Sequence, residues 1–275
     1  MQENNIKVWA EQSDRWKHVG LPTRPSAEDG EFLINSALAF LDPSHSINKV
    51  VVLGVTPEIV ALDWPKNVVI DAFDISRSMI ESVWAPNPKN MSHVHQANWK
   101  SLPLEDESIP LVVGDGCLTA LNGIEEAQSL FKEMHRILCY EGAIMMRCFV
   151  RPLFRENLSA VVDDAINGKI QNFGTLKWRL AMALSEYDGR VRPKLIYQEF
   201  LRCFPNVQAL LDVTGWSLLS IDTIKSYDSM DSFFTFPSLE EVNAVSKQWF
   251  TIEQVFEGSY ELAERCPTII FKKKF

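Results

Sequence analysis

The chain has 275 residues, of which 46% are hydrophobic, so it can form one large domain with an ordinary globular core. Its net charge of −9 is a poor match for binding nucleic-acid phosphates, which requires clustered Lys and Arg. The polar, charged start is no signal peptide, and no apolar run approaches the roughly 20 residues of a membrane span. We therefore expect neither nucleic-acid nor membrane partners.

The cysteines and histidines favour neither disulfide nor metal chemistry. The five cysteines are scattered and form no C-x-x-C pair, which is typical of reduced thiols in a cytoplasmic protein. His93 and His95 share one face of an expected strand, a pattern more typical of an exposed edge or a packing pair than of a metal site. Cys117 has no obvious base beside it, so we expect no covalent thiol mechanism.

Residues 1–46 are predicted to form an N-terminal helical segment with a Pro- and Gly-containing turn between two helices. Ser26 can cap the second helix, which begins at Ala27. Apolar residues recur at helical spacing along it, at Phe32, Leu33, Ala37 and Phe40.

Residues 47–150 alternate between strand and helix patterns. Strands are expected at 49–55, 67–74, 91–98, 108–116 and 142–150, and helices at 57–64, 76–84 and 125–139. This alternation predicts βαβ units with right-handed crossovers, and hence an α/β fold with a Rossmann-like, doubly wound, mostly parallel sheet.

The rest of the chain interrupts and then completes that sheet. Residues 151–235 read as consecutive helices and form a predicted helical insertion. Residues 236–275 return to the core with a helix at 237–249 and strands at 250–256 and 267–275. About ten residues join these strands, too few for a helical crossover, so the last strand is expected to be antiparallel to its neighbour.

In a doubly wound sheet, ligands bind beyond the carboxyl ends of the strands. Gly54 follows the first strand and allows a sharp turn, with Thr56 as the expected N-cap and Pro57 at the first helical position. Such a helix start favours an anion. A turn with a single glycine suits one carboxylate better than a diphosphate, although a plain strand–helix turn remains an alternative.

Polar residues follow the next strands as well. Asp74, 20 residues after Gly54, can accept two hydrogen bonds from a ribose diol, or it can simply cap a helix. Asn98, or the backbone of Trp99, can address an adenine edge. The Trp99 ring can pack on that base or in the core. Asp115 and Gly116 lie where the far end of such a ligand or its reaction partner would bind.

The order of glycine turn, Asp74, "NWKSLPLEDESIPLVVGDG" and antiparallel last strand resembles the class I S-adenosylmethionine-dependent methyltransferases, with ends similar to bacterial members that act on small molecules. The resemblance implies that the turn faces the methionine part of the cofactor, that Asp74 holds the ribose and that Asn98 addresses the adenine amine. The turn lacks the usual acidic residue and further glycines, and Asn98 replaces the commoner Asp, so its carbonyl oxygen would have to accept. The expected cofactor-binding residues are Gly54, Val55, Thr56, Asp74, Ile75, Met79, Asn98, Trp99, Asp115 and Gly116.

The resemblance therefore implies transfer of a methyl group from S-adenosylmethionine to a small-molecule nucleophile by in-line displacement. The insertion and the N-terminal segment would cover the acceptor pocket, with Arg24, Tyr227 and Tyr260 as candidate substrate residues. No catalytic residue is assigned, because a dedicated base is optional. An NAD(P)-dependent oxidoreductase, expected to show G-x-G-x-x-G, and an inactive binding protein of the same fold remain alternatives. The sequence determines neither the acceptor atom nor the oligomeric state.

Overall fold

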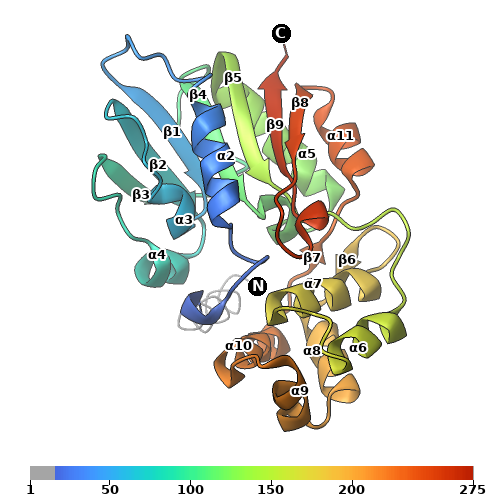
Figure 1. Cartoon of the computed structure of the whole chain (residues 1–275). Coiled ribbons are helices and arrows are strands. Elements are labelled where there is room, and N and C mark those ends of the chain that lie inside the picture. Colours follow the sequence, from blue (N-terminus) through green and yellow to red (C-terminus); the bar gives the residue numbers. More distant parts are fainter. Residues whose placement is uncertain (1–15, 275) are drawn as a thin grey trace.

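A seven-stranded sheet forms the centre of the protein, whose computed structural model describes residues 16–274 (Figure 1). Its order is β3-β2-β1-β4-β5-β9-β8. The strands are β1 Asn48–Leu53, β2 Val68–Asp74, β3 Ser92–Gln96, β4 Ile109–Asp115, β5 Leu138–Arg147, β8 Phe250–Phe256 and β9 Thr268–Lys273.

Strand direction follows the sequence prediction. The pairs β1–β2, β1–β4, β2–β3 and β4–β5 are parallel, whereas β9 is antiparallel to both β5 and β8. The predicted α/β, mostly parallel sheet with a reversed last strand is therefore confirmed. The reversed strand lies inside the sheet, between β5 and β8.

Helices cover both faces of the sheet because its central strands bury alternate side chains on opposite sides. Val50 and Val52 pack toward α2 (Ala27–Ala37) and α3 (Pro57–Val60), while Val51 packs toward α5 (Ile124–Ile137) and α11 (Leu239–Ser246). The helix α4 (Arg77–Val83) follows β2. Short 3₁₀ segments complete this part: η1 Trp16–His18, η2 Cys117–Ala120 and η4 Ala263–Arg265.

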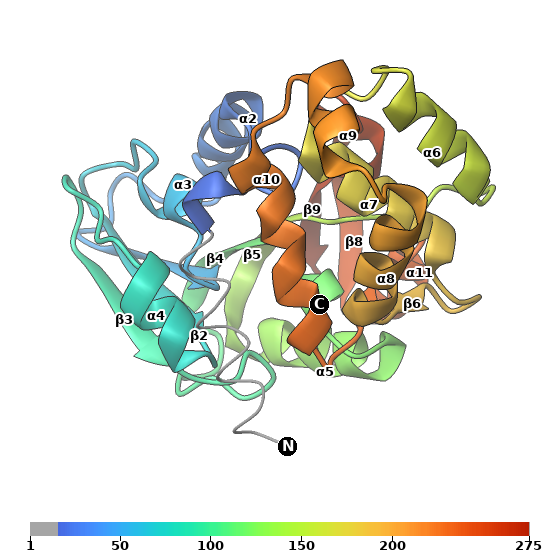
Figure 2. The ribbon, with the colours of Figure 1, turned by 90° about the horizontal axis from the view of Figure 1, so that it is seen from below.

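The helical insertion lies beyond the carboxyl ends of the parallel strands (Figure 1). In Figure 2, which looks at the sheet from that end, α10 and the segment after it lie in front of β4 and β5. In the insertion, buried Leu180, Ile196 and Phe200 belong to an apolar cluster that also includes Phe149 and Leu262 of the core. The elements of the insertion are α6 Leu158–Ile166, α7 Phe173–Leu184, β6 Arg190–Val191, α8 Pro193–Cys203, α9 Val207–Thr214, α10 Leu218–Asp222, η3 Thr223–Ser229 and β7 Phe234–Thr235.

One local difference from the sequence prediction is α3, which ends at Val60 instead of residue 64. A proline at position 65 disfavours helical angles at Trp64, and the Trp64 indole donates instead to the Ile59 carbonyl at 3.0 Å. Thr56 is the N-cap residue as predicted and Pro57 follows it, but the Thr56 side chain makes no capping bond. Ser26 caps α2 as predicted, and the Ser76 side chain caps α4.

Candidate cofactor and acceptor site

A cavity of about 450 Å³ lies at the carboxyl end of the sheet, between the strand ends and the helical insertion. The parallel order β2-β1-β4 brings the turns after these three strands together at one edge. All ten predicted cofactor-binding residues line this cavity: Gly54, Val55, Thr56, Asp74, Ile75, Met79, Asn98, Trp99, Asp115 and Gly116.

Gly54 forms the turn after β1 in a backbone conformation that glycine favours, with a φ of +96°. Its N–H donates to the Phe73 carbonyl at 2.8 Å, which ties the turn to the end of β2. A Cβ here would lie 3.7 Å from the Trp99 ring and 3.9 Å from the Asp74 Oδ2 atom. The missing side chain therefore keeps the floor of the cavity open between an indole ring and a carboxylate.

Asp74 ends β2 with a carboxylate that is only partly engaged. Its Oδ1 atom accepts the Ser76 N–H at 2.7 Å, and among residues 16–274 no Lys or Arg forms an ion pair with it. Burial raises the pKa of Asp74 to about 6, against the lowering effect of the Ser76 hydrogen bond. A mostly ionised carboxylate with unused acceptor positions is what a ribose diol requires.

Asn98 and Trp99 are already bonded to their own chain. The Trp99 indole N–H donates to the Phe73 carbonyl at 2.6 Å, and its ring packs against the core as well as lining the cavity. The Asn98 Oδ1 atom accepts the Lys100 N–H at 3.0 Å. An adenine amine would therefore have to share this oxygen with a backbone group, which an oxygen with two lone pairs permits.

Asp115 forms a buried ion pair that the sequence analysis missed. The Arg147 Nε atom lies 2.7 Å from the Asp115 Oδ1 atom, and both side chains are at most 5% exposed. Burial raises the pKa of Asp115, and the charge of Arg147 opposes that shift. Arg147 also donates to the carbonyls of Pro22 and Thr23, at 2.7 and 3.3 Å. The pair thus fastens the N-terminal segment across the carboxyl end of the sheet.

The three candidate substrate residues lie in different places in the structure, and only one of them lines the cavity. Tyr227 of η3 lines the cavity, whereas Arg24 and Tyr260 are not among its lining residues. Arg24 forms an ion pair with Glu58. The Tyr260 hydroxyl lies 3.5 Å from the Arg147 Nη1 atom. Among these three, only Tyr227 stands where it would meet a ligand in this cavity.

The helical side of the cavity is largely aromatic, and apart from Tyr227 its residues were not predicted from the sequence. The Trp178 ring centroid lies 5.0 Å from that of Phe149 and 5.8 Å from that of Phe234. Tyr227 packs against Phe234 at 5.3 Å. Lys177 adds a buried amine among these rings. Isolated aromatic residues in helical stretches resemble ordinary core positions, so no sequence signal marked them.

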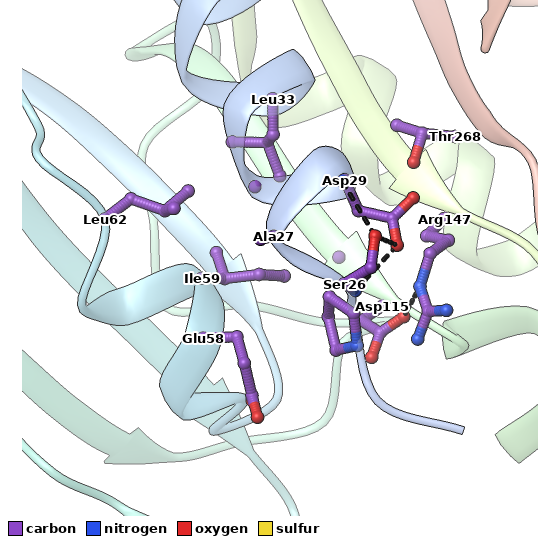
Figure 3. Close-up of a pocket in the computed structure, with 13 residues that line it drawn as sticks. Ser26, Ala27, Asp29, Leu33, Glu58, Ile59, Leu62, Asp115, Arg147 and Thr268 are labelled. Carbon is purple, nitrogen blue, oxygen red and sulfur yellow. Dashed lines mark hydrogen bonds and ion pairs between the residues drawn. The ribbon is translucent and has the colours of Figure 1, made fainter. Parts of the chain in front are cut away.

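A second cavity, of about 380 Å³, lies between α2 and α3 (Figure 3). Figure 3 shows Ser26 bonded to Asp29 and Arg147 paired with Asp115, on the opposite side of the cavity from Glu58. Asp115 lines both cavities. Each of the three carboxylates here has a partner, since Glu58 pairs with Arg24 through its Oε1 atom, although its Oε2 atom has no partner among the described residues. The first cavity is therefore the stronger candidate for a ligand site.

Comparison with known families decides between the methyltransferase and oxidoreductase alternatives. Residues 53–146, which contain the turns described above, match a family model described as a methyltransferase domain. Residues 53–146 therefore form a methyltransferase domain of the class I, S-adenosylmethionine-dependent kind. S-adenosylmethionine is accordingly the cofactor of this enzyme, and its reaction is methyl transfer.

Two of the three solved structures described next, those with TM-scores of 0.50 or more, share the fold at low sequence identity. A candidate zinc-dependent alcohol dehydrogenase from Rhodobacter sphaeroides is 12% identical, with a TM-score of 0.55 over 96% of this chain and 98% of its own. A candidate exported protein from Bordetella parapertussis is 15% identical, with a TM-score of 0.50 over 90% of this chain and 68% of its own. The N-methyltransferase NodS from Bradyrhizobium japonicum WM9, solved with S-adenosyl-L-homocysteine, is 9% identical, with a TM-score of 0.45 over 93% and 91%. No curated protein matches the sequence.

The described residues include neither a membrane-spanning helix nor a cluster of metal-binding side chains. Between residues 16 and 274, no helix combines the length and apolar character needed to cross a membrane. The same part of the chain holds no group of three or more His, Cys, Asp or Glu side chains arranged to bind a metal ion.

Proposed function

We propose that the methyl acceptor is a small molecule that binds in the helical half of the cavity, and that the methyl group reaches it by in-line displacement. The observation that carries this proposal is one continuous cavity that runs from the strand-end turns to the aromatic side chains of the insertion. Its size, about 450 Å³, is in the range of small-ligand pockets.

The strand-end side of the cavity fits the cofactor. Gly54 leaves space for close approach, and Asp74 offers a carboxylate to the ribose hydroxyls. The helix α3 has four residues, so we expect the N–H groups of Val55 and Thr56, more than a helix dipole, to bind the methionine carboxylate; the Gly54 N–H already donates to the Phe73 carbonyl. Ile75 and Met79 add apolar surface for the adenine. When bound, the cofactor supplies a methyl group activated by its sulfonium.

Buried polar atoms without partners support a ligand in the same space. The Thr119 hydroxyl and the Trp178 indole N–H have no hydrogen-bond partner among the described residues, although both residues line the cavity. An unsatisfied buried polar group costs about 1–3 kcal/mol, so such groups are usually satisfied by water or a ligand. They lie between the strand ends and the insertion, where cofactor and acceptor would meet.

The protein's part in catalysis would be mainly positioning. Holding a nucleophile in line with the methyl group in a dry cavity is worth several kcal/mol. Trp178, Phe149 and Phe234 provide an apolar wall that excludes water. We propose no general base, since the positive charge of the sulfonium already activates the methyl group for transfer.

We further propose that the insertion, residues 151–235, acts as a lid together with the N-terminal segment 1–46, of which only residues from 16 onward are described. Amide hydrogen exchange in α7 and η3 should slow when cofactor and acceptor bind together. If exchange slows only in residues 49–120, the insertion is no lid and the acceptor lies elsewhere.

Charge and cysteine content support a small acceptor in a reducing compartment. The net charge of −9 disfavours nucleic acid, and the five cysteines are all free, which agrees with the proposed cytoplasmic location.

Methyl-labelled S-adenosylmethionine, incubated with the enzyme and a fractionated cell extract, tests the acceptor class. We expect label to enter the low-mass fraction. Label confined to protein or RNA would contradict a small-molecule acceptor, and no transfer to any fraction would support an inactive binding protein.

A further inference from the structure

Lys177 is a buried cation without an acidic partner. Its side chain belongs to α7 and lines the cavity, yet the residue is only 3% exposed. The Nζ atom lies 3.1 Å from the Thr223 Oγ1 atom, whose own proton goes to the Ser220 carbonyl at 2.6 Å. No Asp or Glu among residues 16–274 forms an ion pair with it. Two of the three ammonium protons therefore lack a described acceptor.

The other charged side chains of the cavity are compensated or committed. Arg147 neutralises Asp115, and Lys100 pairs with Glu126 at 2.7 Å. On the proposed cofactor side, the Asp74 carboxylate accepts hydrogen bonds from the ribose hydroxyls. Lys177 thus remains as a single uncompensated positive charge on the helical side.

The surroundings of Lys177 are aromatic. Its Nζ atom lies 5.7 Å from the ring centroid of Phe173 and 5.8 Å from that of Tyr227. Desolvation there lowers the pKa of Lys177 to about 8. Buried charges in proteins usually have a group of opposite charge beside them. The Lys177 amine is therefore suited to bind an anionic group of a ligand.

We infer that Lys177 is the counter-ion for a carboxylate on the methyl acceptor, which makes the substrate an aromatic or similarly apolar small molecule with one acidic group. This inference rests on the proposed small-molecule function and adds the class of substrate. The rings of Trp178, Phe149 and Phe234 pack the apolar part, and the Lys177 ammonium pairs with the carboxylate. Lys177 is a specificity-determining residue here, not a base.

The test uses the whole protein saturated with S-adenosylhomocysteine and titrates benzoate, phenylacetate and 3-phenylpropanoate beside their primary amides. At pH 7 at least one acid should bind about tenfold or more tightly than its amide, as expected for a charge-assisted pair. Lys177→Met should remove the preference while keeping S-adenosylhomocysteine affinity. Lys194→Met, which changes an exposed lysine on α8, should leave the preference intact.

A thermal melt separates this role from a merely structural one. Removing an uncompensated buried charge should leave the melting temperature of ligand-free Lys177→Met unchanged or raised, whereas loss of a structural bond would lower it. A lowered melting temperature with an unchanged acid preference would overturn the inference.

The pH dependence gives a second signature. The acid preference should be constant from pH 6.5 to 7.5 and should fall about tenfold per pH unit above 8, as the amine loses its proton. Of the groups packed against Lys177, Tyr227 titrates, but burial raises its pKa above this range. Asp74, Asp115, Glu126 and Lys100 line the rest of the cavity.

Three results would overturn the inference while leaving the proposed function standing: no acid preferred over its amide, a preference that survives Lys177→Met, or a preference that does not fall above pH 8. Failure of S-adenosylhomocysteine to bind would instead count against the proposed function.

Discussion

The two sides of the cavity are built in different ways. The strand-end side consists of the turns after β1, β2 and β4, and its shape is determined mainly by the backbone. Gly54 has a φ of +96°, and the Ser76 N–H donates to the Asp74 carboxylate. The helical side consists of side chains on α7 and η3, packed ring against ring around Lys177.

This difference separates a part of the site set by topology from a part set by side-chain packing. The parallel strand order brings the three turns together whatever their sequence, so a common cofactor can be held there. The helical wall has no such constraint. Its rings and its one amine are free to match a particular acceptor, which fits a fold that hosts many substrates.

The junction of the two sides should be the most sensitive point. Arg147→Met leaves the Asp115 carboxylate buried without its cation, and it releases the Pro22 and Thr23 carbonyls. Breaking such a pair costs about 3–5 kcal/mol. Urea denaturation should show a loss of this size, whereas Arg202→Met, at an exposed pair, should cost under about 1 kcal/mol.

The double variant Asp115→Asn with Arg147→Met should recover much of that stability, because no unpaired charge remains. No recovery would mean that Arg147 acts through its carbonyl contacts with the N-terminal segment and not through the ion pair.

A side chain at the β1 turn should abolish cofactor binding. Gly54→Val forces a branched residue into a φ of +96° and extends it toward the Trp99 ring and the Asp74 carboxylate. Calorimetric titration should show at least a hundredfold weaker binding of S-adenosylmethionine. Gly215→Ala is the matched control: its φ is +69°, but no atom lies within 4 Å of the added Cβ. It should lose stability without losing affinity.

If Gly54→Val binds S-adenosylmethionine with wild-type affinity, the turn does not contact the cofactor. The proposal that the cofactor binds on the strand-end side would then be wrong.

The Asp74 carboxylate should lower the stability of the ligand-free protein and strengthen the binding of S-adenosylmethionine. Because burial raises its pKa to about 6, the folded protein keeps a proton that the unfolded chain releases near pH 4. Stability of the ligand-free protein therefore falls as pH rises from about 4 to about 6. Asp74→Asn keeps the acceptor for the Ser76 N–H and should stabilise the ligand-free protein by about 1–3 kcal/mol at pH 7. It should weaken S-adenosylmethionine binding at least tenfold.

Wild-type affinity should itself fall below pH 6, where Asp74 takes up its proton. Titrations at pH 5, 6, 7 and 8 check this, and an affinity that stays flat across that range would remove Asp74 from the ribose site.

Thr56 should matter least. Its hydroxyl makes no capping bond, so Thr56→Ala should change the free energy of unfolding by less than about 0.5 kcal/mol. Ser26→Ala is the comparison, because Ser26 forms a complete capping box with Asp29 and its loss should cost about 1 kcal/mol. Equal losses in thermal melts would indicate that Thr56 caps α3 in solution.

The sequence predicted the strand-end side far better than the helical side. Gly54 and Asp74 follow runs of β-branched residues whose order determines where their ends meet, so their proximity follows from pattern alone. Arg147 was missed although a single charge at the end of the buried run "GAIMMR" was a signal that it needs a partner. Lys177 lies in "LKWRL", where a lysine in a helix is normally exposed.

The burial of Lys177 depends on how α7 packs between α6, α8 and η3. No periodicity within α7 itself reveals that packing. The breaks within the insertion do carry local signals, because Asn206, Gly215 and Ser217 are ordinary capping residues at the ends of α9 and the start of α10, but the sequence analysis did not divide the insertion there.

A crystal structure with S-adenosylhomocysteine tests the proposed division of the cavity most directly. We predict the ribose hydroxyls on the Asp74 carboxylate, the methionine end over the 54–56 turn and the sulfur facing Trp178 and Lys177. A ligand bound in the cavity between α2 and α3, or one that leaves Asp74 without a contact, would contradict it.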